Sequence, residues 1–246
     1  MGDEGEEVVD SLSVVLPAYN EEENVEQAVK HVSGVAQTLD RDYEIILVND
    51  GSSDRTGEIG RELEKDIPSF RLVEHYPNRG YGGALKAGFE AARKDLIAFY
   101  PGDAQFDFEE VKRLLDQLKE EDADIVCGYR VNRQDNPIRR LNGWGWNLVV
   151  RLLFGYLCRD IDCGFKLFRR RILDHITIRS DGAMIDTELL AGAKARGYDI
   201  AEAPLTHLPR EAGEATGANL HVIVKAFRDL IRFRRRLSRE LQKETW

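Results

Sequence analysis

The sequence predicts an α/β fold: a single domain built on a mostly parallel sheet with helices on both faces. Over the first 130 residues, short runs rich in β-branched and other apolar residues alternate with longer amphipathic stretches. Such alternation is typical of a parallel sheet covered by crossover helices. Because ligands of these sheets bind beyond the carboxyl ends of the strands, we expect the functional residues just after each strand.

The first half is expected to hold five strands and four helices. The strands are Ser13–Leu16, Glu44–Val48, Arg71–Glu74, Leu96–Tyr100 and Ile125–Cys127. The helices, which carry apolar residues at three- and four-residue spacing, are Asn24–Leu39, Arg55–Lys65, Gly83–Arg93 and Phe108–Glu120.

The pattern changes after Gly128. Residues 129–143 are polar, and an aromatic-rich helix is expected from Trp144 to about Leu157. Further along we expect a strand at 163–168, a helix at 184–196, a strand at 198–203, a glycine-containing loop at 209–219 and a long basic helix from Leu220 to about Lys243. Residues 1–10 are expected to be a disordered acidic tail, and residues 11–246 a single domain.

The composition excludes several classes of protein. None of the apolar stretches reaches the roughly 18 residues that a membrane span needs. The acidic start, with Glu6 and Glu7, does not match a signal peptide, which needs a basic start and an apolar run. Three cysteines without metal-ligand spacing fit a reducing compartment, with no disulfide and no zinc. We therefore expect a cytoplasmic protein.

The charge is unevenly distributed. The net charge of −9 argues against nucleic-acid binding, yet His221–Trp246 carries eight Lys or Arg and three acids, a local charge of +5. A basic amphipathic helix there is open to two interpretations: packing on the domain with a solvated charged face, or peripheral contact with a membrane surface or membrane-protein partner. The aromatic-rich helix from Trp144 leaves the same two alternatives open.

Polar motifs follow the first two predicted strands. The first strand runs into Pro17-Ala18-Tyr19-Asn20-Glu21, and the second ends in Asn49-Asp50 followed by Gly-Ser-Ser-Asp. A carboxylate at the end of an apolar strand, as at Asp50, can accept hydrogen bonds from a base or ribose. The residues at 52–54 are explained as turn and helix-capping residues.

Two more motifs follow the third and fourth strands. Asn78-Arg79-Gly80-Tyr81-Gly82-Gly83 resembles a phosphate loop without its usual ending, and a tight helix entry explains it equally well. The fourth strand leads into Pro101-Gly102-Asp103-Ala104-Gln105. A carboxylate there could hold Mg²⁺ or Mn²⁺ against a diphosphate, or could simply lie in a turn.

Together these motifs resemble glycosyltransferase family 2. The segment 13–128 matches its nucleotide-sugar-binding half through Val-Val-Leu-Pro-Ala-Tyr-Asn-Glu-Glu, Val-Asn-Asp-Gly-Ser-Ser-Asp, Asn-x-Gly-x-Gly-x-Ala and Gly-Asp-Ala-Gln. The second half resembles the polyprenyl-phosphate branch, the dolichyl-phosphate mannosyltransferases and their relatives. The matching pieces are Gly-Tyr-Arg at 128–130, Asp-Cys-Gly-Phe-Lys at 162–166, Asp-Thr-Glu at 186–188 and Pro-Arg-Glu-Ala-Gly-Glu at 209–214.

The resemblance implies a Rossmann-like fold of the GT-A type, with a nucleotide-sugar-binding half over 11–128 and an acceptor-facing half over 129–246. It implies a nucleotide-sugar site formed by Pro17, Ala18, Tyr19, Glu21, Asp50, Gly80, Lys86, Asp103 and Gln105. Asp103 would bind the metal with Gln105 beside it. The family usually has Asp-x-Asp where this chain has Pro-Gly-Asp, so the first carboxylate is missing.

The second half would bind the acceptor. Candidates for the acceptor phosphate are Arg130, Arg139, Arg140, Lys166 and Arg210, since cationic side chains suit phosphate oxygens; Arg139 and Arg140 could equally be solvated surface residues. The candidate catalytic residues are Asp103, Gln105, Asp162, Asp186 and Glu188. A phosphate acceptor is already ionised near neutral pH and needs positioning, whereas a hydroxyl acceptor would need Asp162, Asp186 or Glu188 as a base.

The expected function is transfer of a hexose, with inversion, from GDP-mannose or UDP-glucose to a polyprenyl or dolichyl phosphate with Mg²⁺ or Mn²⁺. Two alternatives remain close to it: a soluble or glycan acceptor, and a non-catalytic nucleotide-sugar-binding subunit. A nucleotidyltransferase is disfavoured because the loop after the first strand lacks a Gly-rich, Lys-containing signature.

Overall fold

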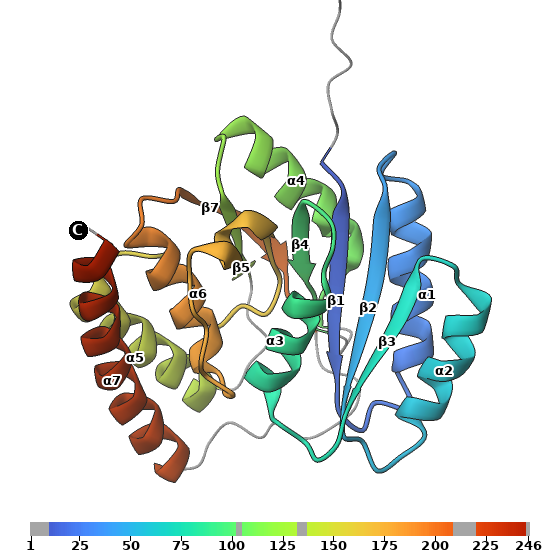
Figure 1. Ribbon diagram of the computed structural model, residues 1–246, viewed down its shortest axis with the longest axis horizontal. Coiled ribbons are helices and arrows are strands. Elements are labelled where there is room, and N and C mark those ends of the chain that lie inside the picture. The colour runs from blue at the N-terminus through green and yellow to red at the C-terminus, as the bar shows by residue number, and fades with distance from the viewer. Residues whose placement is uncertain (1–9, 102–104, 132–136, 209–219, 245–246) are drawn as a thin grey trace, which may run out of the picture.

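A computed structural model describes residues 10–101, 105–131, 137–208 and 220–244, and these residues form a seven-stranded sheet with helices on both faces (Figure 1). The strand order is β3-β2-β1-β4-β6-β5-β7. The strands are β1 Leu12–Ala18, β2 Tyr43–Asp50, β3 Phe70–His75, β4 Leu96–Phe99, β5 Ile125–Val131, β6 Lys166–Arg169 and β7 Ile200–Thr206. The acidic tail predicted for residues 1–10 lies, apart from Asp10, outside the described residues.

The helices form two layers, one on each face of the sheet (Figure 1). Their bounds are α1 Val25–Gln37, α2 Thr56–Asp66, α3 Tyr81–Ala91, α4 Val111–Glu120, α5 Pro137–Phe154, α6 Met184–Lys194 and α7 Leu220–Glu244, with short 3₁₀ turns η1 Phe108–Glu110 and η2 Arg170–Asp174. Helices α1, α2 and α4 pack on one face, and α3, α5, α6 and α7 pack on the other. Both faces of the sheet are therefore buried, as the long apolar strands predict.

The sheet is mostly parallel, as predicted, but β6 runs against its neighbours. Strand β1 pairs in parallel with β2 and β4, β2 with β3, and β5 with β7. Strand β6 lies antiparallel between β4 and β5, with Lys166 opposite both Phe99 and Cys127. Because β6 begins where β4 and β5 end, the residues that precede it lie at the same edge as the carboxyl ends of the parallel strands.

The boundaries of α5 differ from those the sequence predicts. The helix begins at Pro137 rather than Trp144, inside the polar stretch at 129–143. Proline suits the first turn of a helix, where its missing N–H is not needed. The helix ends at Phe154, before the expected Leu157, because Gly155 adopts a positive φ of 81° and its N–H donates to Arg151 O (2.9 Å).

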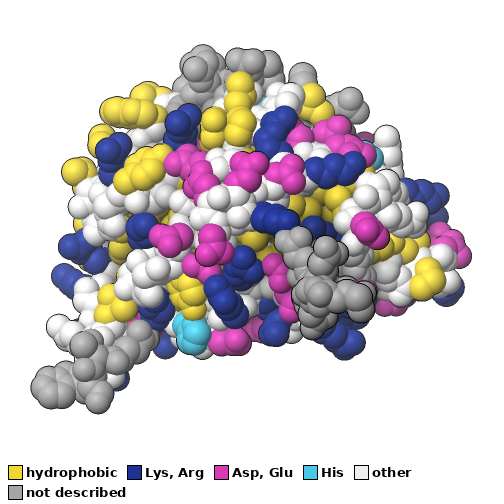
Figure 2. Space-filling model, turned by 90° about the horizontal axis from the view of Figure 1, so that it is seen from above, with side chains coloured by type: hydrophobic (Ala, Val, Ile, Leu, Met, Phe, Trp, Pro, Cys, Tyr) yellow, Lys and Arg dark blue, Asp and Glu magenta, His cyan; other side chains and the backbone are white. Residues whose placement is uncertain are grey.

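Described side chains of both charges lie on the face at the amino ends of the parallel strands. Lys, Arg, Asp and Glu side chains are interspersed across this view (Figure 2). Hydrophobic side chains show toward the left margin, the side on which α5 and α7 lie in Figure 1. Among the helices that the structure describes, none combines the length and the apolar character needed to cross a membrane.

Candidate active site

Hydrogen bonds join the loops that follow β1 and β2. Asn20, with a positive φ of 54°, donates its N–H to Ser52 Oγ (2.9 Å), and its Oδ1 accepts from Ser53 N (2.8 Å). Glu21 N donates to Thr56 Oγ1 (2.9 Å). Pro17 and Ala18, at the end of β1, pair in register with Val48 and Asn49 of β2. These hydrogen bonds and the strand pairing fix the backbone at the start of the predicted nucleotide site. Tyr19 is 52% exposed.

Asp50 is buried at the end of β2 and is held by β3. Its Oδ1 accepts a hydrogen bond from Arg79 N (2.8 Å) and lies 3.2 Å from His75 Nδ1. His75 is the in-register partner of Asp50 and is itself buried. The sequence reasoning missed His75, although a polar residue at the end of an apolar strand was the same signal that identified Asp50.

The glycine-rich start of α3 contacts a distant loop of the same chain. Gly82 N and Gly83 N donate to Asp181 O (2.9 and 3.3 Å), and a side chain at Gly82 would collide with the same loop, 2.7 Å from Asp181 C. Lys86 forms an ion pair with the Asp181 carboxylate. Lys86, which the resemblance implies for the donor site, is therefore occupied by Asp181 in this arrangement, and so are the N–H groups of Gly82 and Gly83. Gly80 has a positive φ of 81° and begins the helix.

Gln105 follows β4 and lies beside the end of β7. Its backbone oxygen accepts from Leu208 N (2.9 Å), and the Phe106 ring packs 5.6 Å from the His207 ring. Gln105 and His207 are both buried. The sequence reasoning also missed His207, whose only signal was its position directly after a strand.

The proposed metal ligands are Asp103 and Gln105, and Asp103 lies outside the described residues. Within the part of the chain that is described, no cluster of three or more His, Cys, Asp or Glu residues could hold a metal. A carboxylate and an amide oxygen are the hard oxygen donors that Mg²⁺ and Mn²⁺ prefer. The chemistry of this donor set therefore fits a divalent cation.

Arg130 is engaged by Asp160 in a bidentate ion pair. Arg130 Nε and Nη2 each lie 2.7 Å from an oxygen of the Asp160 carboxylate, and both side chains are more than nine-tenths buried. This pair anchors the end of β5 to the loop before β6. Sequence reasoning identified Arg130 but not its partner, because 30 residues separate the two.

Lys166 is completely buried at the start of β6. Its Nζ donates to Ile161 O (2.9 Å), to Cys163 O and to Asp186 Oδ1 (2.5 Å). Burial is the largest influence on the pKa of this ammonium and lowers it, but the Asp186 carboxylate and the three neighbouring cysteines together raise the pKa above its usual value. An ammonium with no exposed surface cannot touch an acceptor phosphate in this arrangement, so Lys166 and Asp186 form an internal ion pair.

Asp162 differs from its acidic neighbours because its side chain is exposed. It nevertheless lies among enough protein that desolvation raises its pKa to about 6, and the carboxylates of Asp186 and Asp160 act in the same direction. A carboxyl group that is both accessible and titrates near neutral pH is suited to proton transfer.

Glu188 binds three donors and is almost fully buried. Its Oε2 accepts from Arg179 N (2.7 Å) and Ser180 N (3.0 Å), and its Oε1 accepts from Arg236 Nη2 of α7 (2.8 Å). Glu188 therefore ties the 179–180 loop and α7 to α6. Of the three carboxylates that the sequence offers as a base, only Asp162 is accessible.

The remaining acceptor candidates are not described at the level of side chains. Arg139 and Arg140 lie in the first turn of α5, but their side chains fall outside the described part, as does Arg210 altogether. What the structure brings to one edge is Asp50 and Gln105 from the first half, with Arg130 and Asp162 from the second.

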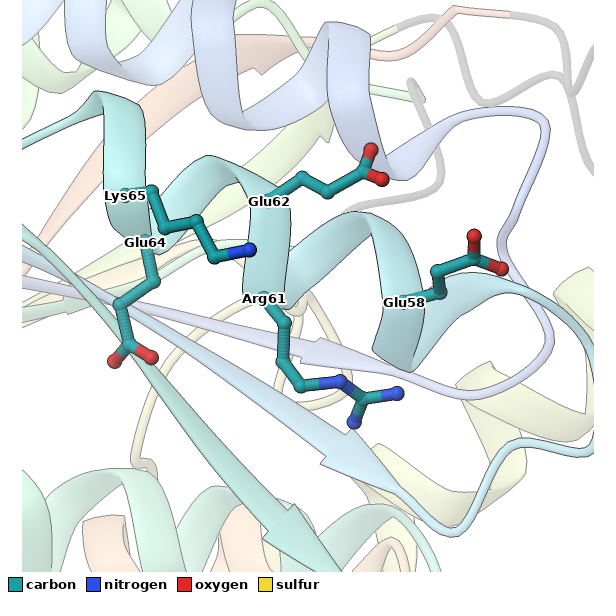
Figure 3. A pocket seen from close by; sticks show the side chains of 5 residues that line it. All are labelled: Glu58, Arg61, Glu62, Glu64 and Lys65. Carbon is teal, nitrogen blue, oxygen red and sulfur yellow. The ribbon is translucent and has the colours of Figure 1, made fainter.

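A shallow surface hollow of about 400 Å³ lies elsewhere on the molecule. It is lined by charged side chains of α2 alone, namely Glu58, Arg61, Glu62, Glu64 and Lys65 (Figure 3). No residue of the strand-end loops lines it, so we assign it no part in the candidate site.

Comparison with known proteins identifies similar sequences. A 33% identity over 223 residues links the chain to an undecaprenyl-phosphate 4-deoxy-4-formamido-L-arabinose transferase of Pseudomonas fluorescens, covering 89% of this chain and 64% of that protein. A dodecaprenyl-phosphate galacturonate synthase of Rhizobium johnstonii is 30% identical over 204 residues, covering 82% of this chain and 60% of that protein. The chain thus spans a little under two thirds of the length of these relatives.

Solved structures with the same fold include a glucosyl-3-phosphoglycerate synthase of Mycobacterium tuberculosis. Its complex with phosphoglyceric acid superposes with a TM-score of 0.71 at 21% identity, covering 93% of this chain and 80% of that one. Its complex with Mn²⁺, uridine diphosphate and glucosyl-3-phosphoglycerate gives a TM-score of 0.68, covering 91% of this chain and 78% of that one. This likeness confirms the predicted GT-A-type fold.

The family profile described as glycosyl transferase family 2 matches residues 13–177. That match covers more than half of the chain, and it includes the motifs after β1, β2, β3 and β4 as well as Arg130, Asp160 and Asp162. The chain therefore belongs to glycosyl transferase family 2.

Proposed function

We propose that this protein transfers a sugar from a nucleotide-sugar donor to a polyprenyl phosphate, with inversion at the anomeric carbon. The observation that supports the proposal is that candidate residues from both halves of the chain lie at one sheet edge, where we assign a donor side and an acceptor side. Asp50 and the braced loops after β1 and β2 form the donor side, and the exposed Asp162 before β6 faces the same edge. Such an arrangement brings two substrates together and reduces the entropic barrier to their reaction.

The names of the relatives support the acceptor class. The proteins at 33% and 30% identity are called an undecaprenyl-phosphate transferase and a dodecaprenyl-phosphate synthase, and their printed sugars are a formamido-arabinose and a galacturonate. We extend the polyprenyl-phosphate acceptor to this chain. The experiment below therefore tests nucleotide donors of four sugars: mannose, glucose and the two sugars named for the relatives.

In the proposed reaction an oxygen of the acceptor phosphate attacks the anomeric carbon. A new carbon–oxygen bond forms as the bond to the nucleoside diphosphate breaks, and the bonding electrons leave with the diphosphate. A phosphate monoester loses its last proton at a pKa of about 6. Asp162, whose pKa is raised to about 6, accepts that proton from the monoanionic form, so the acceptor attacks as a dianion. A single displacement inverts the configuration at the anomeric carbon.

Asp103 and Gln105 would hold the divalent cation, Mg²⁺ or Mn²⁺. A cation bound there would supply positive charge to balance the negative charge that develops on the leaving diphosphate. The backbone of Gln105 is anchored by Leu208 N at the end of β7, which fixes this segment against the second half of the chain.

We also propose that α5 and α7 rest on a membrane surface. Four apolar side chains of α5 share one helical face and are exposed, namely Leu141, Trp144, Leu148 and Leu152. On the neighbouring α7, Phe227 packs 6.1 Å from Trp146, and Ile231 is exposed. The described part of α7 also exposes five arginines: Arg228, Arg232, Arg234, Arg235 and Arg239. Apolar side chains flanked by arginines suit an anionic lipid surface, where a polyprenyl phosphate resides.

The test is the release of nucleoside diphosphate from a panel of nucleotide sugars, with and without a short polyprenyl phosphate and with Mg²⁺, Mn²⁺ or chelator. We expect release that requires both lipid and metal, that is lost in Asp103→Ala, and that falls by about 10²–10⁴-fold in Asp162→Asn. Lys65→Ser, on the distant hollow over α2, is the control and should retain full activity. Release that is independent of the lipid phosphate would contradict the proposed acceptor.

A further inference from the structure

Tyr81, the first residue of α3, reaches the sheet edge at the carboxyl ends of the parallel strands. A Cβ built on Gly164 would lie 3.5 Å from the Tyr81 hydroxyl oxygen and 3.4 Å from Cγ of Pro101. Pro101 follows β4 and Gly164 precedes β6, so the hydroxyl lies where these two segments meet. Tyr81 is 36% exposed, which leaves its side chain within reach of a ligand at this edge.

The two segments beside the hydroxyl lead to residues proposed for the reaction. Pro101 continues in sequence to Asp103, the proposed cation ligand, and Gly164 comes two residues after Asp162, the proposed proton acceptor. The leaving diphosphate therefore belongs to the first segment and the acceptor phosphate to the second. In a single displacement the anomeric carbon lies between the entering and the leaving oxygen, so the transferred sugar belongs between the two segments.

The start of α3 is positioned by the loop that precedes α6. Gly82 N donates to Asp181 O (2.9 Å). A Cβ on Gly82 would lie 2.7 Å from both Asp181 C and Gly182 O. A Cβ on Gly80 would lie 2.9 Å from Asp181 O. The residues on both sides of Tyr81 must therefore be glycine for this loop to come so close.

The loop that precedes α6 is itself anchored at two points. The Asp181 carboxylate forms an ion pair with Lys86 of α3. Glu188 Oε2 accepts hydrogen bonds from Arg179 N (2.7 Å) and Ser180 N (3.0 Å). The backbone on which the Tyr81 side chain depends is therefore held by contacts from both α3 and α6.

A phenol has the chemistry that suits a sugar. Its hydroxyl both donates and accepts hydrogen bonds, as each hydroxyl of a sugar does. Its ring presents an apolar face, against which the C–H groups of a sugar ring can pack. A neutral side chain of this kind distinguishes one sugar from another through the position of a single hydroxyl group.

We infer that the Tyr81 hydroxyl forms a hydrogen bond with a hydroxyl group of the transferred sugar; this inference rests on the proposed function. Tyr81 is then a specificity-determining residue for the sugar, separate from the groups that bind the nucleotide and the acceptor. Gly82 and Asp181 are positioning residues that act through Tyr81.

The experiment compares nucleotide sugars with free nucleoside diphosphates in calorimetric titrations of the full chain. The probes are the nucleotide sugars of mannose, glucose, 4-deoxy-4-formamido-L-arabinose and galacturonate, with UDP and GDP, all with Mn²⁺ and without lipid. Tyr81→Phe keeps the ring and removes only the hydroxyl oxygen. We expect it to weaken the nucleotide sugar that wild type binds most tightly by about three- to tenfold, the equivalent of one hydrogen bond. Binding of UDP and GDP should change by less than about twofold.

Tyr43→Phe is the matched control, because it removes the same atom at the amino end of β2, at the opposite edge of the sheet. It should leave every titration unchanged. Equal weakening of the nucleotide sugar and its diphosphate by Tyr81→Phe, or weakening of neither, would overturn the inference and leave the proposed transfer standing. A wild-type chain that binds none of the nucleotide sugars would overturn both.

Gly82→Ala tests the positioning of Tyr81. The new Cβ collides with Asp181 and Gly182, so the start of α3 must shift. In a folded variant we expect the nucleotide sugar to lose affinity relative to its free diphosphate. Added to Tyr81→Phe, the substitution should change that ratio by less than about twofold, because the hydroxyl it displaces is already absent. Additive losses would overturn the positioning role. The control is Gly34→Ala, where the described part of the chain places nothing within 4 Å of the added Cβ outside its own helix.

Nucleotide sugars that each lack one hydroxyl group identify the partner of Tyr81. Where the missing group is the one that Tyr81 contacts, wild type should bind the analogue about as weakly as Tyr81→Phe binds the parent, and Tyr81→Phe should cause no further loss. The other analogues should keep the full difference between the two proteins. A difference preserved for every analogue would show that Tyr81 bonds to no sugar hydroxyl, and would overturn the inference.

Discussion

Three carboxylates of residues 129–246, all of them candidate bases by sequence, differ in what surrounds them. Asp186 is buried against Lys166, and Glu188 is buried against Arg236 and two backbone N–H groups. Asp162 alone is accessible, and its pKa is raised to about 6. Environment, rather than residue type, therefore separates a candidate proton acceptor from two structural anchors.

Asp162→Asn is expected to remove activity and yet raise stability at alkaline pH. The folded-state pKa of about 6 lies above the ordinary value of 3.8, so the folded protein favours the protonated carboxyl. The associated stability is fully present below pH 3.8 and is lost as the pH rises through about 6. A neutral amide should therefore melt higher than wild type at pH 8, with the difference vanishing towards pH 4.

Thermal melts of wild type and Asp162→Asn from pH 4 to pH 8 would check the direction of this stability difference. The matched control is Asp42→Asn, at an exposed carboxyl outside the site. Activity of the wild type should decline below about pH 6 as the carboxyl becomes protonated. A melting difference that grows at low pH would contradict the raised pKa.

Lys166→Met is expected to destabilise the fold by about 3–5 kcal/mol, because it leaves the buried Asp186 carboxylate without its cation. Adding Asp186→Leu should recover most of that loss, since an apolar pair of similar volume needs no charge compensation. Urea denaturation measures both. A neutral effect of the single substitution would show that Asp186 is protonated in the folded protein.

At the scale of elements, α7 is joined to the domain by both apolar and ionic contacts. Leu230, Phe233 and Leu237 are buried against the layer of α3, α5 and α6. Arg236 reaches the buried Glu188 of α6, whose other oxygen holds the 179–180 loop. That loop continues to Asp181, which accepts hydrogen bonds from the start of α3, so α7 is connected through α6 to the proposed donor side of the site.

The coupling between α6 and α7 is measurable by a double-mutant cycle. Glu188→Gln and Arg236→Ala should interact by about 0.5–3 kcal/mol in urea unfolding, because the two side chains share one partly buried ion pair. Arg232→Ala, whose pair with Asp229 is exposed on the same helix, should change stability by less than about 0.5 kcal/mol. An additive cycle would show that α7 is held by its apolar side chains alone.

The sequence predicts the elements better than their pairings. The strands and helices of the first half are confirmed to within a few residues, because hydrophobic periodicity is a local signal. The reversed β6 and the pairs Asp50–His75, Arg130–Asp160 and Glu188–Arg236 were not foreseen. These pairs join residues 25, 30 and 48 positions apart, and one sequence carries no local signal for such contacts.

The same limit explains the different outcomes at the candidate site. Asp50 could be identified from its place at the end of an apolar strand, which periodicity reveals. Lys166 was predicted to bind the acceptor phosphate because it lies in the Asp-Cys-Gly-Phe-Lys motif. In the structure it is completely buried and donates to three oxygens that the fold brings together. Its accessibility, unlike its position in the motif, is a property of tertiary packing.

On the scale of the whole molecule, the residues proposed for the donor and acceptor sides lie at one sheet edge, and the exposed α5 face lies in the same helical layer as α6 and α7. Trp144→Ser with Leu148→Ser should weaken sedimentation with anionic phospholipid vesicles by about tenfold, because each buried apolar side chain contributes to interfacial binding. Turnover of a short, water-soluble polyprenyl phosphate should be unchanged. Lys65→Ser, on the opposite helical layer, is the control. Equal vesicle binding by wild type, the double variant and Lys65→Ser would refute the membrane-facing role of α5.

The structure of the reaction product tests the proposed sugar transfer to a polyprenyl phosphate most directly. Wild-type protein would be incubated with an α-linked nucleotide sugar, a short polyprenyl phosphate and Mn²⁺, and the lipid fraction analysed by mass spectrometry and by NMR of the anomeric proton. We expect a polyprenyl monophosphate carrying one β-linked sugar, with release of an equal amount of nucleoside diphosphate. An α-linked product, or free sugar with unmodified lipid phosphate, would contradict it.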